Sequence, residues 1–276
     1  MDESSGTLPV PKRRVFLTPM RVTVVAPSPS LAPFVRRFEV VETSEASTRT
    51  LLPEPGLVLG IRFGGRAALL GGGRPEALPQ SSVTGLRTTV RQMRTSAGGG
   101  IVVVKFRPAG AALFFDSPLH EVFGAIRPLT DWVPARDVDR LESRLAEAKD
   151  HATRIALVEA FLLERMGKRR SDGLVVAALR EIQSAPDSIR IGALADALDV
   201  SLDLLEKRFR RIVGCSPKQF STILRLRGAV ERHRQGMSLT QLSLEAGFYD
   251  QAHFIRHFRS MAGVSPRRFL EGGAYC

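Results

Sequence analysis

The residues of this chain that are best suited to a chemical task lie near its C-terminus. Gln251, Ala252, Ile255, Arg256 and Arg259 recur at the spacing of one face of a helix. Arginine can donate two hydrogen bonds to guanine, glutamine can pair with adenine, and small apolar side chains can contact the methyl group of thymine. This set predicts a helix that reads base edges in the major groove of DNA.

A second polar set lies upstream, on another predicted helix. Asp203, Glu206, Lys207 and Arg210 are spaced i, i+3, i+4 and i+7, and Ser201, a candidate contact as well, is a suitable N-cap. Carboxylates can accept a hydrogen bond from cytosine N4, but they repel phosphates. We therefore expect the downstream set to supply the tighter or more specific contacts.

The two sets belong to an internal repeat. Phe209–Phe220 (FRRIVGCSPKQF) recurs 49 residues later as Phe258–Phe269 (FRSMAGVSPRRF). Upstream, Leu194–Ser201 corresponds to Leu242–Asp250 with an offset of 48, so the second copy has one more residue near its turn. Chance is a poor explanation for so much aligned detail, and a repeat of this kind indicates a repeated structural unit.

Each copy is predicted to form a helix, a tight turn and a second helix. In the first copy Ile191–Leu198 is the short helix and residues 199–201 make the turn. In the second copy Ser238 and Gln241 fit a capping box that opens a helix over Leu239–Ala246. Gly247 then supplies the turn and Asp250 caps the next helix. The side chains predicted to face the interior are Leu202, Leu205, Phe209, Ile212, Phe254 and Phe258.

A long helix is predicted between the copies. Ser216 is an N-cap followed by Pro217 at the first helical position, and the helix continues to about Arg234. Eighteen residues span about 27 Å. A helix of this length can hold two reading helices about 34 Å apart, which is one turn of DNA, so that both enter the same face of a duplex.

Residues 173–275 resemble the AraC-type transcription regulators. In the first copy the resemblance rests on Ile191, Leu194-Ala195, Val200-Ser201, Leu205, Phe209, Gly214, Ser216-Pro217 and Phe220. In the second copy it rests on a longer and more specific motif: Leu242, Ala246-Gly247-Phe248, Asp250-Gln251, His253-Phe254, Arg256, Phe258, Gly263-Val264-Ser265-Pro266 and Phe269. The resemblance implies a seven-helix DNA-binding domain with two helix-turn-helix units, joined to a sensing or dimerising domain.

The resemblance also assigns roles by position. It places base or phosphate contacts on Asp203, Glu206, Lys207, Arg210, Gln251, Ala252, Ile255 and Arg256. His253 takes the family's position beside the turn, where it packs or contacts phosphate. Lys207 stands where the family often has arginine, which departs from the simplest pattern.

The region before residue 137 is predicted to be β-rich. Val22–Val25, Val35–Val41, Leu57–Phe63 and Ile101–Phe106 are short β-branched or aromatic runs. Gly64–Gly65, Gly71–Gly73 and Gly98–Gly100 are interpreted as turns between them, in a small sandwich or barrel. The segments Leu31–Phe38, Val103–Gly110 and Pro118–Trp132 more weakly resemble the cupin-like sensor domains of one branch of the same family. The predicted fold class is α+β: this β domain followed by an all-α domain.

Four segments are expected along the chain. Residues 1–20 form a disordered tail, 21–136 a β-rich sensor or dimerisation domain, 137–170 a helical linker and 171–276 the DNA-binding domain. Residues 137–166 are predicted to form two amphipathic helices that pack on the β domain or on a second copy. The basic, small-residue segment Gly167–Gly173 is a plausible hinge.

Composition limits the alternatives. The formal net charge of +12 suits a partner rich in phosphate, but residues 174–276 hold 15 Lys and Arg against 10 Asp and Glu, so charge alone does not locate the binding face. No apolar run is long enough to span a membrane. The only two cysteines, Cys215 and Cys276, form neither a disulfide framework nor a zinc site, which favours a cytoplasmic protein.

The sequence favours a sequence-specific transcription regulator that binds double-stranded promoter DNA and is controlled through its N-terminal domain. RNA polymerase, a small-molecule effector and a second copy of the chain are further candidate partners, and no cofactor or metal is expected. One alternative is an architectural DNA-binding protein without an effector. A less favoured one is a cupin-type enzyme fused to a DNA-binding domain, because the β region holds one histidine, His120, where a metal site needs several.

Overall fold

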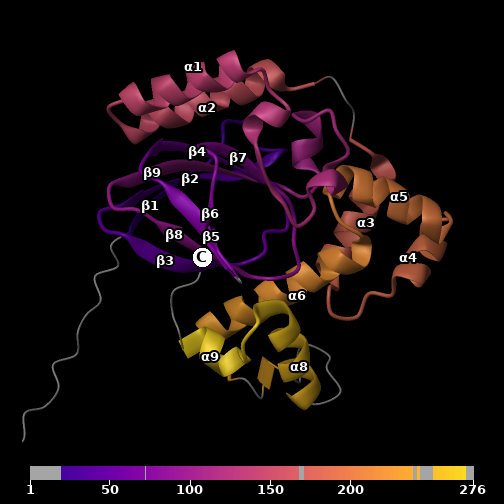
Figure 1. Ribbon diagram of the computed structural model, residues 1–276. Coiled ribbons are helices and arrows are strands. Elements are labelled where there is room, and N and C mark those ends of the chain that lie inside the picture. The colour runs from indigo at the N-terminus through magenta and orange to yellow at the C-terminus, as the bar shows by residue number, and fades with distance from the viewer. Residues whose placement is uncertain (1–19, 72, 168–170, 239–240, 243–250, 272–276) are drawn as a thin grey trace, which may run out of the picture.

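The computed structural model describes residues 20–271 except 72, 168–170, 239–240 and 243–250. A β-rich N-terminal part is capped by two helices, and the remaining helices lie beside and beneath it (Figure 1). Three sequence predictions fall outside the described residues: the disordered tail except Met20, most of the helix over 239–246, and the turn and cap at 247 and 250. Met20 itself begins the first strand rather than ending a tail.

Ten strands form two antiparallel sheets. The six-stranded sheet has the order β1 (Met20–Val25), β2 (Val35–Thr43), β9 (Gly99–Phe106), β4 (Val58–Gly64), β7 (Ser81–Thr84) and β10 (Ile126–Pro128). The four-stranded sheet has the order β3 (Ser47–Leu51), β8 (Arg91–Thr95), β5 (Ala67–Leu70) and β6 (Glu76–Ala77). An interior cavity of about 140 Å³ is lined by strands of both sheets. This arrangement agrees with the predicted sandwich.

The apolar runs of β2 and β9 form the middle of the six-stranded sheet, whereas the run in β1 lies at its edge, with Val22 and Val24 exposed. In β2 and β9, Val40 pairs with Val102 and Phe38 with Val104, and all four side chains are buried. The four strands predicted from such runs are confirmed. Strands such as β3 (STRTL) and β8 (RQMRT) were missed because polar side chains alternate with few apolar ones, so their period-two signal is weak.

The predicted glycine turns are confirmed at Gly65 and Gly98, whose φ angles of 69° and 65° favour glycine. The assignment of Gly99 and Gly100 to a loop is wrong, because both residues belong to β9. A Cβ at Gly100 would lie 2.2 Å from the Phe63 ring, so packing against this ring, rather than a turn, requires glycine there.

Helices α1 (Ala135–Glu147) and α2 (His151–Arg165) lie over the six-stranded sheet (Figure 1). Of the two packing partners left open by the sequence, the structure shows the β part of the same chain. The Arg154 guanidinium stacks 4.0 Å from the ring centroid of Phe63 in β4. The Glu159 carboxylate accepts a hydrogen bond of 2.7 Å from the backbone N–H of Ser28.

The other helices form the C-terminal part. They are α3 (Gly173–Ser184), α4 (Ile191–Ala197), α5 (Leu202–Val213), α6 (Pro217–Arg234), α8 (Gln251–Ala262) and α9 (Pro266–Glu271). One core cluster runs from the β part through α1, α2, α3, α4 and α5 into the start of α6. The end of α6 packs with α8 and α9 in a second cluster that also includes Leu52 of the β part.

The start of α6 is fixed by the predicted cap. The Ser216 hydroxyl accepts a hydrogen bond from Gln219 N (3.2 Å), and Gln219 Oε1 accepts one from Ser216 N (2.8 Å). We expect Ser216→Ala to lower the free energy of unfolding by about 0.5–2 kcal/mol, measured by urea denaturation, because the backbone N–H of Gln219 loses its acceptor. The control, Thr222→Ala, removes a hydroxyl from the exposed side of α6. Equal stability of the two variants would contradict the assigned cap.

Candidate nucleic-acid interface

The first helix-turn-helix unit is formed by α4, the turn at 198–201 and α5. Asp199 adopts a left-handed conformation with φ of 53°, which reverses the chain between the helices. Ser201 is the N-cap of α5, and its hydroxyl accepts a hydrogen bond of 3.2 Å from Leu204 N. The predicted turn and cap are therefore confirmed, and the Ser201 hydroxyl stabilises the start of the helix.

The polar set predicted on α5 faces solvent. Asp203, Lys207 and Arg210 are exposed, and Glu206 is half-buried. Glu206 pairs with Arg210 at 3.2 Å, one helical turn away. This pair offsets part of the positive charge that Arg210 could offer a phosphate, so α5 presents a face of mixed charge.

The prediction that Leu202 faces the interior is wrong, since its side chain is 47% exposed. Leu205 and Phe209, at the same helical stripe, are fully buried, and Ile212 is half-buried. Leu202 is the first residue of α5, and a position on the apolar stripe does not ensure burial at the end of a helix. Leu204 is also 41% exposed.

The second unit carries the other predicted set on α8. Phe254 and Phe258 are buried as predicted, at 3% and 1% exposure. Ala252, Arg256 and Arg259 are exposed and Ile255 is half-buried, so most of the predicted outer face is open to solvent. The side chains of Gln251 and His253 lie outside the described residues. The Ser238–Gln241 capping bonds are present, at 3.0 and 3.3 Å.

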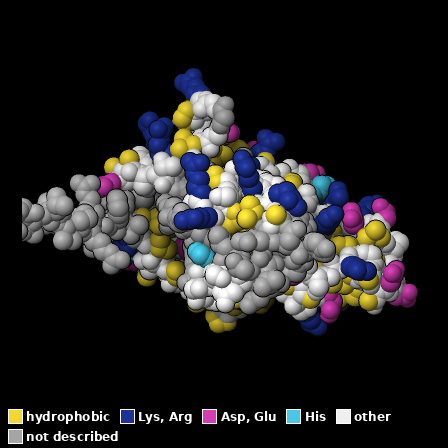
Figure 2. All heavy atoms as spheres, turned by 90° about the horizontal axis from the view of Figure 1, so that it is seen from below, with side chains coloured by type: hydrophobic (Ala, Val, Ile, Leu, Met, Phe, Trp, Pro, Cys, Tyr) yellow, Lys and Arg dark blue, Asp and Glu magenta, His cyan; other side chains and the backbone are white. Residues whose placement is uncertain are grey.

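The charges of the two units differ in their distribution (Figure 2). On the face that carries the C-terminal helices, Lys and Arg side chains gather toward the middle, whereas Asp and Glu side chains concentrate at the end where α4 and α5 lie. This agrees with the acidic residues counted on the first unit in the sequence. The second unit is therefore the one with the more favourable charge for a polyanion.

Helix α6 connects the units over the predicted length, Pro217 to Arg234. Near its start, the ring of Phe220 packs edge-on against Phe209 of the first unit, with centroids 5.7 Å apart. Near its end, Leu226 and Val230 are buried among the residues of the second unit. One continuous helix thus spaces the two reading helices.

A cluster of buried charges joins α6 to the β part, and sequence reasoning missed it. Glu54 lies between β3 and β4, and its carboxylate contacts Lys105 at 2.9 Å, Arg36 at 2.7 Å and Arg227 of α6 at 3.2 Å. Arg227 also donates a hydrogen bond of 3.0 Å to the carbonyl of Pro53. The available signal was a carboxylate between two prolines, Pro53-Glu54-Pro55, which holds the loop in an extended shape.

The charges around Glu54 decide its protonation. Burial, the largest single influence, raises its pKa, but the charges of Lys105, Arg227 and Arg36 together outweigh burial and lower the pKa below its ordinary value. The carboxylate is therefore ionised at neutral pH and holds α6 to the β part through ion pairs.

Two further contacts place the helix-turn-helix units against the β part. The backbone N–H of Val90 donates a hydrogen bond of 3.0 Å to the carbonyl of Met261, the next-to-last residue of α8. At the first unit, Gly214 ends α5 with φ of 98° and lies against Leu119 of the short 3-10 helix η2 (Leu119–Val122). Both units therefore touch the β part while their reading faces remain open.

His120 and Cys215, the residues considered for metal binding and nucleophilic chemistry, lie on different elements. His120 is exposed on η2, and no group of three His, Cys, Asp or Glu that could hold a metal occurs among the described residues. Cys215 is buried between α5 and α6, and burial raises the pKa of its thiol. Within the described part of the chain, no helix has the length and apolar character needed to cross a membrane.

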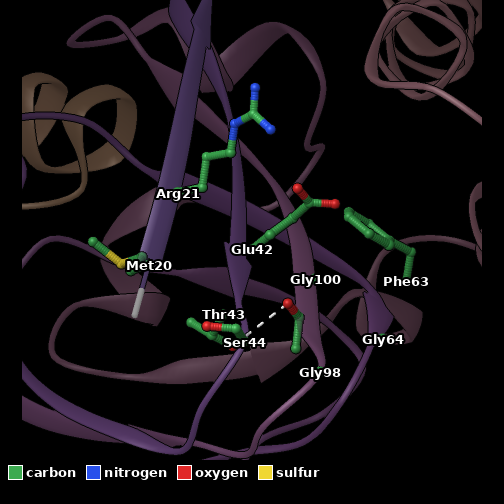
Figure 3. Close-up of a pocket in the computed structure, with 10 residues that line it drawn as sticks. Met20, Arg21, Glu42, Thr43, Ser44, Phe63, Gly64, Gly98 and Gly100 are labelled. Atoms are coloured by element: carbon green, nitrogen blue, oxygen red, sulfur yellow. Dashed lines mark hydrogen bonds between the residues drawn. The ribbon is translucent and has the colours of Figure 1, made fainter. Parts of the chain in front are cut away.

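A surface depression of about 510 Å³ lies at one end of the six-stranded sheet (Figure 3). It brings together strand ends that include Arg21, Glu42, Phe63 and the glycines at 98–100. The Thr43 hydroxyl donates hydrogen bonds to the carbonyls of Ser96 (3.2 Å) and Gly99 (3.4 Å). The Thr43 hydroxyl thus bonds to the segment that leads into β9.

Two protein-family models match the chain. Residues 194–272 match a helix-turn-helix domain, and residues 23–126 match a domain of unknown function (DUF6597). The first range covers both units described above, and the second covers the strands of the β part.

Individual relatives include HTH-type transcription regulators. An uncharacterized HTH-type transcriptional regulator of Haemophilus influenzae is 28% identical over 43% of this chain and 39% of its own length. The HTH-type transcriptional activator RhaS of Escherichia coli is 32% identical over 31% of each chain. The chain thus spans a third or so of the length of these curated relatives. Among solved structures, ToxT of Vibrio cholerae is 12% identical, with a TM-score of 0.47 over 91% of this chain and 98% of ToxT.

Proposed function

We propose that the C-terminal part of this chain is an AraC-type helix-turn-helix domain and that the protein is a transcription regulator that reads double-stranded DNA with both units; the match of residues 194–272 to a helix-turn-helix domain and the similarity to RhaS support this. The observation that carries the proposal is the repeated pair of helices α5 and α8. Each buries its aromatic residues, Phe209 or Phe258, and leaves a polar face open to solvent. A regulator of this kind acts in the cytoplasm.

The second unit supplies the base contacts that matter most in this proposal. Arg256 is exposed at the middle of α8, where a bidentate contact with guanine is available, and the neighbouring Gln251, Ala252 and Ile255 suit adenine and thymine. Arg259 and His253 complete the set at this unit. Ser201, Asp203, Glu206, Lys207 and Arg210 form the corresponding set on the first unit, with weaker net attraction to phosphates.

We expect Arg256→Ala to weaken binding to the preferred site by about 1–3 kcal/mol and to relax sequence preference at one base pair, because a bidentate contact is lost. Fluorescence anisotropy with the preferred site and with single-base variants measures both effects. Arg268→Ala is the matched control, since it removes an exposed arginine of α9 that is outside the proposed set. Unchanged affinity and specificity in Arg256→Ala would refute this assignment.

Control through the N-terminal domain is part of the proposal. Its support is the set of contacts described above, in which Glu54 holds Arg227 and Val90 holds Met261. A ligand or a second copy that favours another arrangement of the β part would change the position or availability of the reading helices. The cavity between the sheets, about 140 Å³, is smaller than the roughly 300–1,000 Å³ of drug-sized ligand pockets, so it suits a very small effector.

The proposal assigns binding rather than catalysis to the chain, in line with relatives that are transcription regulators. Recruitment of RNA polymerase and dimerisation through the N-terminal domain belong to the same proposal. The competing function, an architectural DNA-binding protein, predicts a steep dependence of affinity on salt with almost no base preference. Comparing the preferred site with a scrambled duplex at several salt concentrations separates the two functions.

A further inference from the structure

A second pocket, separate from the cavity between the sheets, lies where the β part meets the first helix-turn-helix unit. Its volume is about 440 Å³, within the range of pockets that hold drug-sized ligands. It is lined by the 3-10 helix η1 (Gly110–Leu113) with the residues after it, by the N-cap and first turn of α3 and by one side of α5. Three elements that are distant in the sequence therefore form one concave surface.

The floor of this pocket is apolar and fixed in place. Phe115 and Val175 are buried there, with 4% and 0% of their surface exposed. The Phe115 ring packs edge-on against Phe106 and Trp132, with centroids 6.2 and 5.6 Å away. Val176 lies at the same pocket and keeps 39% exposure, which is high for a valine. The floor suits the apolar body of a ligand.

The α5 wall of the pocket is cationic. Arg208 is held by the Asp172 carboxylate, at 2.6 Å from Nη2 and 2.8 Å from Nε, and the other oxygen of Asp172 caps α3 by accepting from Val175 N at 3.2 Å. Arg211 adds a second guanidinium, which makes no ion pair with any residue that the structure describes. Asp116 lies at the exposed rim, so a ligand with one anionic group fits better than one charged along its whole length.

The pocket uses a side of α5 that differs from its DNA-reading face. Arg208, Arg211 and Ile212 line the pocket, whereas Asp203, Lys207 and Arg210 point to solvent. At 100° per residue these two groups lie on adjacent sides of the helix. A molecule in the pocket would thus contact the reading helix without covering the residues proposed to contact DNA.

We propose that this pocket binds an amphipathic organic anion, with its apolar body on Phe115 and Val175 and its anionic group on Arg211. Guanidinium groups pair with carboxylates and sulfonates through charge-assisted hydrogen bonds, which are among the stronger polar contacts in a partly enclosed site. Arg208, already oriented by Asp172, provides a second donor at the same wall.

The test is a titration of the full-length protein with 8-anilinonaphthalene-1-sulfonate, an aromatic sulfonate that fluoresces on binding. Saturable binding is expected, and Arg211→Ala should weaken it about tenfold or more, because one charge-assisted contact is lost. Ala112→Trp, which fills the pocket without changing charge, should weaken it as well. Arg180→Ala is the control, since it removes an exposed arginine of α3 that lies outside the pocket, and it should bind like the wild type.

Equal affinity in the wild type, Arg211→Ala and Ala112→Trp would overturn the proposal, and so would binding that does not saturate. A melting curve for each variant shows whether the fold is retained. Because the titration contains no DNA, its failure would leave the proposed DNA-binding function standing. Conversely, a failure of DNA recognition would leave a positive titration intact.

Discussion

Replacing Phe258 by alanine is expected to unfold the second helix-turn-helix unit at a cost of roughly 3–5 kcal/mol, the usual range for truncating a buried aromatic side chain. The Phe258 ring is 1% exposed and packs between Phe254 and Phe269, with ring centroids 5.9 and 5.5 Å away. Its neighbours in the second core cluster are packed against one another, so a cavity would remain where the ring was. Hydrogen exchange measured by mass spectrometry should show protection lost in α8 and retained in α5.

The matched control for this prediction is Arg268→Ala, which removes an exposed side chain from α9. Its urea denaturation curve should overlay that of the wild type. The inside and outside faces assigned to α8 would be contradicted if Phe258→Ala melted normally and kept the wild-type exchange pattern in residues 251–262.

Glu54→Ala is expected to destabilise the protein by roughly 3–5 kcal/mol, because it removes the carboxylate that Arg36 and Arg227 share and leaves Lys105 paired with Glu39 alone. The Glu54 side chain is 12% exposed and its partner Lys105 is 11% exposed, so water cannot replace the lost ion pairs. Arg227 would lose its attachment to the β part as well. A double-mutant cycle with Arg227→Ala, followed by urea denaturation, measures the coupling across the junction.

The control and the pH dependence make this prediction specific. Glu42→Ala breaks a partly exposed pair with His151 and should cost less than about 1 kcal/mol. Since the folded pKa of Glu54 lies below its ordinary value of 4.5, its contribution is fully present above that pH and is lost as pH falls through the folded value. Glu54→Gln should therefore weaken the loss of stability in acid. Identical acid-unfolding curves for Glu54→Gln and the wild type would show that the ion pairs contribute nothing.

The sequence predicted the parts of the fold in which burial follows a clear period. The apolar runs of β2 and β9 and most of the apolar stripe of α5 were predicted correctly, because neighbouring elements bury them along nearly their whole length. Leu202 was misassigned because a stripe says nothing of where the covering layer ends. The short polar strands β3 and β8 had too few apolar side chains to reveal their alternation.

The sequence predicted the two parts of the candidate site that belong to the internal repeat. The exposed positions of α5 and α8 follow from helical spacing, and the repeat locates them without knowledge of the tertiary structure. The junction at Glu54 and the pocket beside Arg211 depend on segments more than 90 residues apart, since Glu54 contacts Arg227, and Phe115 and Arg211 line the same pocket. No periodic pattern within one segment encodes such a meeting, so only the folded chain reveals it.

The most direct test of the two-unit regulator is selection of DNA from a randomised pool by the purified full-length protein near physiological salt. The account predicts enrichment of a motif with two conserved blocks about one helical turn apart, because α6 spaces the two reading helices on one face of the duplex. The same selection with Arg256→Ala should lose one block. No enrichment, with binding that collapses as salt rises, would contradict sequence-specific reading by both units.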